Sequence, residues 1–120
     1  MAYRQRLGRW GEGVALNYLV GKGLVPTGSN LRTQYGEIDL IMKDGNTIVF
    51  IEVKTRTNKK YGLPEVSITR LKQLHIKQSA EFLMQQHPDW GANWRIDVLA
   101  ISGQPGDPAP EILWFENAVE

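Results

Sequence analysis

The sequence of 120 residues predicts a mixed α/β fold, and three observations carry that prediction. Apolar residues recur at helical spacing in residues 4–21 and return in a second helix-like segment over 65–86. Two β-branched apolar runs, 37–42 and 47–55, flank an Asp44-Gly45 dipeptide that is typical of a hairpin turn. Two more strand-like runs, 94–102 and 111–115, follow the second helix. With a short strand after the first helix, the predicted order is α-β-β-β-α-β-β in one domain spanning 1–120.

The first helix is predicted from the spacing of Leu7, Val14 and Tyr18, and we expect it to end at the glycines of 21–23. Residues 24–33 follow as a short strand. Because proline cannot donate to a β-ladder and glycine weakens a strand, Pro26 and Gly28 place this strand at a sheet edge or make it irregular.

The second helix follows a polar loop at 57–64. We expect it to begin near Pro64, or at Ser67 or Thr69, whose hydroxyls can cap a helix, and to end before Pro88. Its apolar residues form no single stripe, so the pattern does not indicate which face packs. The strands at 94–102 and 111–115 are separated by a turn region at 103–110.

The composition excludes several classes of protein. The chain has no cysteine, which rules out a disulfide scaffold, a thiol nucleophile and a Cys-ligated metal. No apolar run approaches the ~20 residues of a membrane span, and the N-terminus lacks the apolar core of a signal peptide. We therefore expect a cytoplasmic protein without a membrane partner.

The formal net charge of +1 hides an uneven distribution. Residues 1–60 hold ten Lys and Arg against five acids, whereas residues 61–120 hold four against eight. The segment 54–77 alone carries seven bases and a single acid, Glu65. A basic surface on a near-neutral protein can bind phosphate backbones, because affinity follows the local potential. The alternative interpretation is an ordinary solvated Lys and Arg surface.

The predicted hairpin gathers charged residues. A turn centred on Asp44-Gly45 would pair Glu37 with Glu52, and alternation would then project five side chains from one face: Glu37, Asp39, Glu52, Lys54 and Arg56. Opposed like charges destabilise a sheet, so something must compensate them, and Lys54 is one candidate to pair with an acid. A hard divalent ion such as Mg²⁺ prefers carboxylate oxygens and would serve. The alternative is an ordinary salt-bridged strand end.

Glu12 adds a further acid near the core-facing side of the first helix. Gly8, Gly11 and Gly13 surround it, and each glycine in a helix interior costs about 1 kcal/mol relative to alanine. Such glycines are reasonable where another backbone comes close. The alternative is that the helix begins later and that Glu12 stabilises its N-terminus.

Taken together, Glu12, residues 36–41 and residues 50–56 resemble the signature of the PD-(D/E)xK nucleases, in which an Asp ends one strand and Glu-x-Lys lies on the strand hairpinned to it. More closely, the sequence resembles the YraN-like uncharacterised bacterial family, whose fold is similar to that of archaeal Holliday-junction resolvases. The resemblance extends through residues 30–32, Lys72 and residues 95–98. It implies a restriction-endonuclease-like αβββαβ core with a mixed central sheet flanked by helices.

The resemblance also implies roles for individual residues. Asp39 and Glu52 would bind the metal, Lys54 would orient or activate the attacking water, and Glu12 would be the additional helix-borne catalytic acid. Glu37 is expected as a further metal ligand. The proline that gives the motif its name is absent before Asp39. The expected nucleic-acid contacts are Arg32, Arg56, Lys59, Lys60 and Lys72.

The expected activity is hydrolysis of phosphodiester bonds in DNA, branched or otherwise structured, with Mg²⁺ or Mn²⁺ as cofactor. Such an ion lowers the pKa of water and stabilises the charge that develops on the phosphate. Two alternatives stay open, namely a non-catalytic nucleic-acid-binding module and a partner-dependent subunit of a DNA-processing complex. The resemblance further implies a homodimer. We interpret the two His and four Trp residues as structural.

Overall fold

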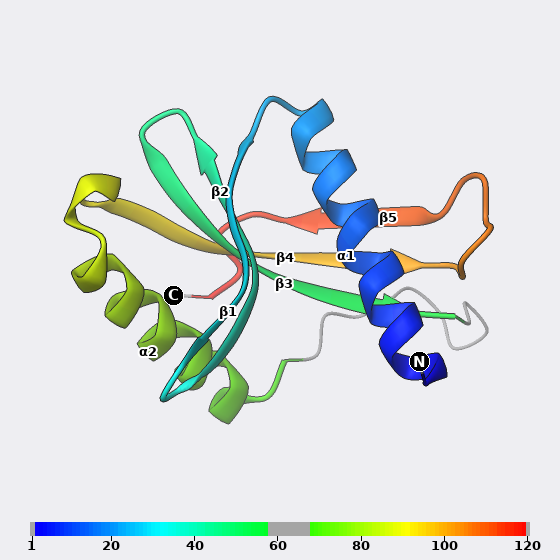
Figure 1. Cartoon of the computed structure of the whole chain (residues 1–120), viewed down its shortest axis with the longest axis horizontal. Coiled ribbons are helices and arrows are strands. Elements are labelled where there is room, and N and C mark those ends of the chain that lie inside the picture. The colour runs from blue at the N-terminus through cyan, green and yellow to red at the C-terminus, as the bar shows by residue number, and fades with distance from the viewer. Residues whose placement is uncertain (1, 58–67, 120) are drawn as a thin grey trace.

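The computed structural model describes residues 2–57 and 68–119 (Figure 1). Within these ranges the element order confirms the prediction and adds one short 3₁₀ turn, η1. The elements are α1 (Tyr3–Gly21), β1 (Val25–Thr33), β2 (Gly36–Asp44), β3 (Thr47–Arg56), α2 (Arg70–Gln86), η1 (Pro88–Trp90), β4 (Asn93–Ser102) and β5 (Glu111–Phe115).

The five strands form one sheet in the order β1-β2-β3-β4-β5. Strands β3 and β4 are parallel, and each of the other neighbouring pairs is antiparallel. The parallel pair follows from the connection through α2, because parallel strands need a long crossover and a helix commonly supplies it. The mixed sheet with its two helices confirms the expected restriction-endonuclease-like core.

Strand β1 lies at the edge of the sheet, as Pro26 and Gly28 predicted. Its pairing with β2 shifts by one residue between these two positions. An edge strand tolerates this irregularity because only one of its sides must hydrogen-bond.

The register of the β2–β3 hairpin differs from the prediction. The two central turn residues are Gly45 and Asn46 rather than Asp44 and Gly45, since Asp44 pairs with Thr47. Gly45 has φ +60°, which suits the first central position of a type II′ turn. The whole register is therefore displaced by two residues, and the predicted pairing of Glu37 with Glu52 is wrong.

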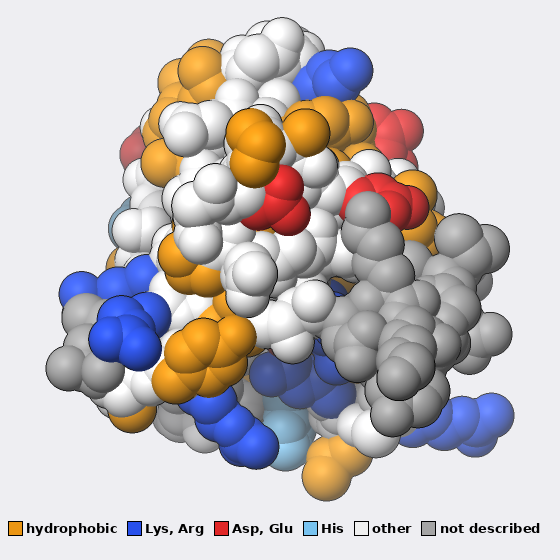
Figure 2. All heavy atoms as spheres, turned by 90° about the vertical axis from the view of Figure 1, so that its right-hand side faces the viewer, with side chains coloured by type: hydrophobic (Ala, Val, Ile, Leu, Met, Phe, Trp, Pro, Cys, Tyr) orange, Lys and Arg blue, Asp and Glu red, His pale blue; other side chains and the backbone are white. Residues whose placement is uncertain are grey.

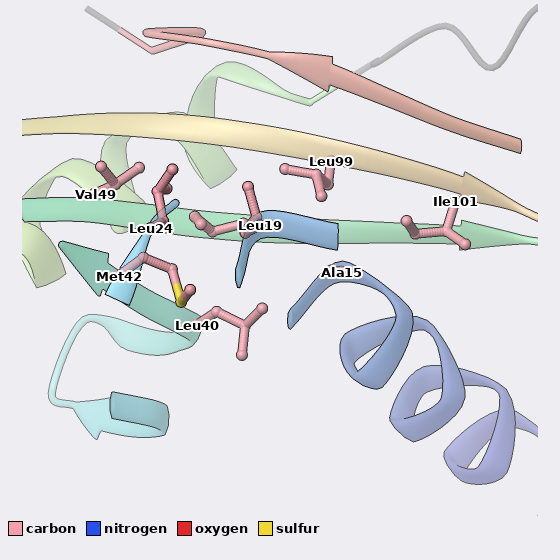
Figure 3. Close-up of a cluster of buried hydrophobic side chains, with 9 residues drawn as sticks. Ala15, Leu19, Leu24, Leu40, Met42, Val49, Leu99 and Ile101 are labelled. Atoms are coloured by element: carbon pink, nitrogen blue, oxygen red, sulfur yellow. The ribbon is translucent and has the colours of Figure 1, made fainter. Parts of the chain in front are cut away.

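Apolar side chains cover both faces of the sheet. On one face, α1 packs through Ala15 and Leu19 onto side chains of β2, β3 and β4 (Figure 3). On the other face, α2 packs onto the sheet through Ile76, Ala80 and Leu83. These three residues identify the packed face of α2 that the sequence pattern left open.

The ends of α2 and the aromatic residues agree with the sequence interpretation. Pro64 and Ser67 lie outside the described residues, and Thr69 caps the helix through its side chain, which accepts a hydrogen bond from the Lys72 backbone N–H at 3.1 Å. Trp90 and Trp94 both pack against Phe50, and His87 stacks on Trp90 with ring centroids 3.9 Å apart. Neither helix within the described ranges has the length and apolar character needed to cross a bilayer.

Candidate functional site

The regular alternation of β2 breaks at Asp39. Ile38 packs into the cluster beneath α2, whereas Leu40, only two residues later, packs into the cluster beneath α1. The backbone pairing of β2 with β3 ends beside this point, at Leu40 and Ile51. The Val53 backbone N–H instead donates to Asp39 Oδ2 at 2.9 Å. The carboxylate of Asp39 therefore lies where the two strands separate.

Glu52 lies next to Asp39, on the α2 side of β3. The register that brings Leu40 to Ile51 places the next residues, Asp39 and Glu52, side by side, and their carboxyl groups hydrogen-bond to each other. Glu52 is only 8% exposed, and its Oε1 lies 3.4 Å from Lys72 Nζ of α2. Two carboxyl groups thus lie together, one of them buried, beside a half-exposed ammonium group of α2.

Burial dominates the acid–base behaviour of this pair. It raises the pKa of Glu52, with Asp39 adding to the effect and Lys72 opposing it, to about 7. Burial likewise raises the pKa of Asp39, and the Val53 N–H opposes that rise. Without a cation, the pair resists carrying two negative charges at neutral pH.

Lys54 follows two residues after Glu52 in a part of β3 that pairs regularly with β4. Alternation therefore directs both side chains to the same face, as predicted. Lys54 is half-buried, and Arg56, the last residue of β3, is exposed. The Glu-x-Lys segment thus presents an acid and a base on one side of the sheet.

A second acidic group lies on the α1 side. With the Asn30 amide oriented so that its nitrogen faces the acids, it donates to Glu12 Oε1 at 2.8 Å and to Glu37 Oε1 at 3.0 Å. Arg32 Nε lies 3.3 Å from Glu37 Oε2. The expectation that Glu37 projects with Glu52 from one face is therefore wrong, because the break at Asp39 turns Glu37 toward α1.

This second group borders a cavity of about 550 Å³ between α1 and the β1–β2 hairpin, lined by Gln5, Gly8, Arg9, Glu12, Asn30, Arg32 and Glu37. Burial, followed by the charges of Asp39 and Glu37, raises the pKa of Glu12. Asp39 therefore interacts electrostatically with acids on both sides of it. The two groups are separate, and Asp39 is the acid whose charge acts on members of both.

Across residues 2–57 and 68–119, no three acidic or histidine side chains converge closely enough to hold one ion. The structure brings together Asp39 and Glu52, and separately Glu12 and Glu37. The assignment of Glu37 as a metal ligand stays a prediction.

The predicted nucleic-acid contacts are placed unevenly. Lys72 contacts Glu52, and Arg32, whose side chain is 86% exposed, contacts Glu37. Lys59 and Lys60 lie outside the described residues. Figure 2 views the molecule from the end where β3 terminates, and most Lys and Arg side chains visible there lie below the acidic ones.

The site contains two contacts that sequence reasoning missed: the Asn30 bridge and the Lys72–Glu52 ion pair. Asn30 and Lys72 both lie in segments that resemble the YraN-like family, and that resemblance was the only feature of the sequence that pointed to them. Asp97, another part of it, is fully buried and accepts hydrogen bonds from Arg95, Trp114 and the Asn117 backbone. That arrangement fastens the C-terminal segment to β4 and is structural.

The fold and its paired carboxylates define a mixed α/β protein with a restriction-endonuclease-like core. Residues 11–101 match the model of the Uncharacterised protein family UPF0102, and the chain belongs to this family. The family is the YraN family, so the resemblance seen in the sequence is confirmed.

Relatives in this family align along nearly the whole chain. A UPF0102 protein of Pseudomonas savastanoi pv. phaseolicola is 39% identical over 118 residues, covering 98% of this chain and 95% of the relative. A UPF0102 protein of Caldicellulosiruptor saccharolyticus is 41% identical over 115 residues, covering 96% and 98% respectively. One from Caldicellulosiruptor bescii is 46% identical over 98 residues, covering 81% and 82%.

Proposed function

We propose that this protein is a Mg²⁺- or Mn²⁺-dependent endonuclease that hydrolyses phosphodiester bonds in DNA, including branched or structured DNA. One observation carries the proposal: Asp39 and Glu52 lie side by side where β2 and β3 separate, with Lys54 directed to the same face. Lys72 favours the ionised form of Glu52, but burial and Asp39 outweigh it, and the pKa of Glu52 still rises to about 7.

The chemistry of these donors fits a hard divalent cation. Mg²⁺ is commonly held by one or two carboxylates and keeps several waters, so Asp39 and Glu52 suffice as protein ligands. Burial raises the pKa of both acids even though Lys72 lies beside Glu52, so a bound cation would favour their ionised forms. When bound, the ion would lower the pKa of a water and stabilise the charge on the phosphate.

The remaining roles belong to side chains around this pair. Lys54 would orient the attacking water and stabilise negative charge on the phosphate oxygens. Glu12, whose pKa is raised in part by the charge of Asp39, would be the helix-borne acid of the site. When the cation supplies positive charge to Glu52, Lys72 would be available to contact a phosphate of the substrate.

The substrate would lie across the basic end of the sheet. Arg56 is exposed at the end of β3, and Arg32 is exposed at the mouth of the cavity. Arginine binds phosphate through two parallel hydrogen bonds, which fixes the position of a backbone without reading its bases. The surface therefore favours recognition of nucleic-acid shape over sequence.

Cytoplasmic localisation and a homodimer stay predictions.

The test is cleavage of junction, flap, single-stranded and duplex DNA, with RNA alongside, in Mg²⁺ or Mn²⁺. We expect Asp39→Asn, Glu52→Gln and Lys54→Ala each to lower the rate by about 10²-fold or more. Lys43→Ala is the matched control, because Lys43 is exposed near the opposite end of β2. This variant should cleave DNA like wild type.

Binding without cleavage under every condition would instead support the non-catalytic module. Cleavage that survives in both Glu52→Gln and Lys54→Ala would place the catalytic centre elsewhere and overturn the proposal. Activity that appears only after a partner protein is added would support the partner-dependent subunit.

A further inference from the structure

Asn30 occupies the gap between two carboxylates. Its amide nitrogen lies 2.8 Å from Glu12 Oε1 and 3.0 Å from Glu37 Oε1. An ionised carboxylate only accepts hydrogen bonds, and an Asn amide has two N–H donors, so one donor is available for each acid. A single neutral side chain thus satisfies two negative groups that belong to different elements, α1 and β2.

The backbone of β1 is bent to allow this contact. Asn30 has φ +49°, in the left-handed region that Asn adopts more readily than most residues. It lies between the Ser29–Leu40 and Leu31–Ile38 pairs, directly across from Asp39. The unusual conformation of β1 therefore coincides with the break in β2, and Asn30 is directed toward α1.

From this geometry we propose that Asn30 is a positioning residue, which holds the carboxylates of Glu12 and Glu37 beside Asp39. The catalytic part of this inference rests on the proposed function, whereas the hydrogen bonds themselves do not. Asn30 would act through the two acids and would not touch the scissile phosphate.

The physical need for such a residue follows from the charges. Glu12 and Glu37 repel each other, and Asp39 adds a third acid nearby. Arg32 forms an ion pair with Glu37, and the charge of Arg9 offsets only part of the effect on Glu12, whose pKa stays raised. A hydrogen bond to a charged group is stronger than one between neutral groups, and one to each acid biases the rotamers of the two flexible Glu side chains.

Two variants remove the bridge in different ways. Asn30→Gly keeps the left-handed backbone and deletes the amide. Asn30→Asp keeps the shape and replaces both donors by a third carboxylate. Asn117→Gly is the matched control, because Asn117 is another exposed Asn with φ +51°, and its backbone N–H serves Asp97 far from this cavity.

The first measurement uses the metal-free protein and needs no activity. We expect the side-chain amide signals of Asn30 in ¹⁵N–¹H NMR spectra, identified by their loss in Asn30→Gly, to move in both Glu12→Gln and Glu37→Gln. Signals that stay unchanged in both variants, at the shifts of freely solvated amides, would overturn the inference.

The second measurement separates positioning from binding and folding. We expect Asn30→Gly to lower kcat about tenfold, which corresponds to about 1.4 kcal/mol, with KM for DNA within about twofold of wild type. Asn30→Asp should lower it further, and Asn117→Gly should leave both constants unchanged. An unchanged kcat in both Asn30 variants would refute the positioning role. If the wild type cleaves nothing, the proposed function fails, while the NMR result still decides the bridge.

Discussion

At the scale of single residues, the arrangement of Asp39 and Glu52 is costly for the protein without a cation. Both carboxyl groups are largely removed from water, and Asp39 disfavours ionisation of Glu52, whereas the hydrogen bond between the two carboxyl groups favours ionisation of Asp39. The Lys72 ammonium group offsets only part of this, since the pKa of Glu52 still rises to about 7. Sites that destabilise their own charges are common where a ligand later supplies compensation.

This pair makes stability depend on pH. The pKa of Glu52 rises from 4.5 to about 7 on folding, so between these values the folded state holds a proton that the unfolded state releases. The contribution of Glu52 to the free energy of unfolding of the metal-free protein should therefore be highest below pH 4.5. It should fall as pH rises toward 7, by up to about 3 kcal/mol, and level off above it.

Urea unfolding in EDTA between pH 5 and pH 8, followed by tryptophan fluorescence, measures this dependence. Glu52→Gln is the control, because an amide cannot ionise and should flatten the curve over that range. A wild-type curve parallel to that of Glu52→Gln would show that Glu52 ionises normally.

At the scale of elements, the contact of α1 with β3 depends on a glycine. A Cβ at Gly11 would overlap with the Thr55 side chain, whereas one at Gly13 would meet open space. The close approach anticipated for the glycines around Glu12 therefore applies to Gly11 among them. It sets how near Glu12 comes to the sheet.

Alanine substitutions should separate these glycines. Gly11→Ala should destabilise the protein by about 1–3 kcal/mol, because overpacking forces a shift of α1. Gly13→Ala should stabilise it by about 0.5–1 kcal/mol through helix propensity alone. Thermal unfolding of both variants, and of Gly11→Ala combined with Thr55→Ala, measures this. If the second substitution does not relieve the first, Thr55 is not the obstacle.

At the scale of the whole molecule, the net charge of +1 is a sum of a basic and an acidic half. Four acids of the basic half lie in two neighbouring pairs, Asp39 with Glu52 and Glu12 with Glu37. The neutral total therefore does not argue against a polyanionic partner, because the bases and acids are segregated.

The proposed DNA surface should show in the salt dependence of binding. In EDTA, affinity for duplex DNA should fall linearly with the logarithm of salt concentration and vary little with sequence. Arg56→Ala should reduce the slope by about 0.9, the value for one phosphate contact. Lys43→Ala should leave the slope unchanged, and fluorescence anisotropy measures both. Equal slopes for wild type and Arg56→Ala would remove Arg56 from the interface.

Much of the site was predictable because its residues carry local signals. The Glu-x-Lys spacing places Glu52 and Lys54 on one face of any strand, and apolar β-branched runs mark that strand. The contacts of Lys72 and Asn30 carry no such signal. Both contacts join residues no more than about 20 positions apart. The Lys72 contact depends on how α2 crosses the sheet, and the Asn30 contact depends on a left-handed backbone conformation, and no sequence periodicity predicts either.

The sequence by itself determined the order of the elements and indicated that β1 is an edge strand or an irregular one, and the resemblance named Asp39 and Glu52 as acids that act together. Only the tertiary structure decided which residues face each other across the hairpin and on which side each acid lies. The physical reason is the period of a strand. Because side chains alternate every two residues, a register displaced by two leaves the predicted faces of a regular strand unchanged, and the pattern cannot detect it. The break at Asp39 escapes the pattern too, since it depends on the packing of Ile38 and Leu40 beneath different helices.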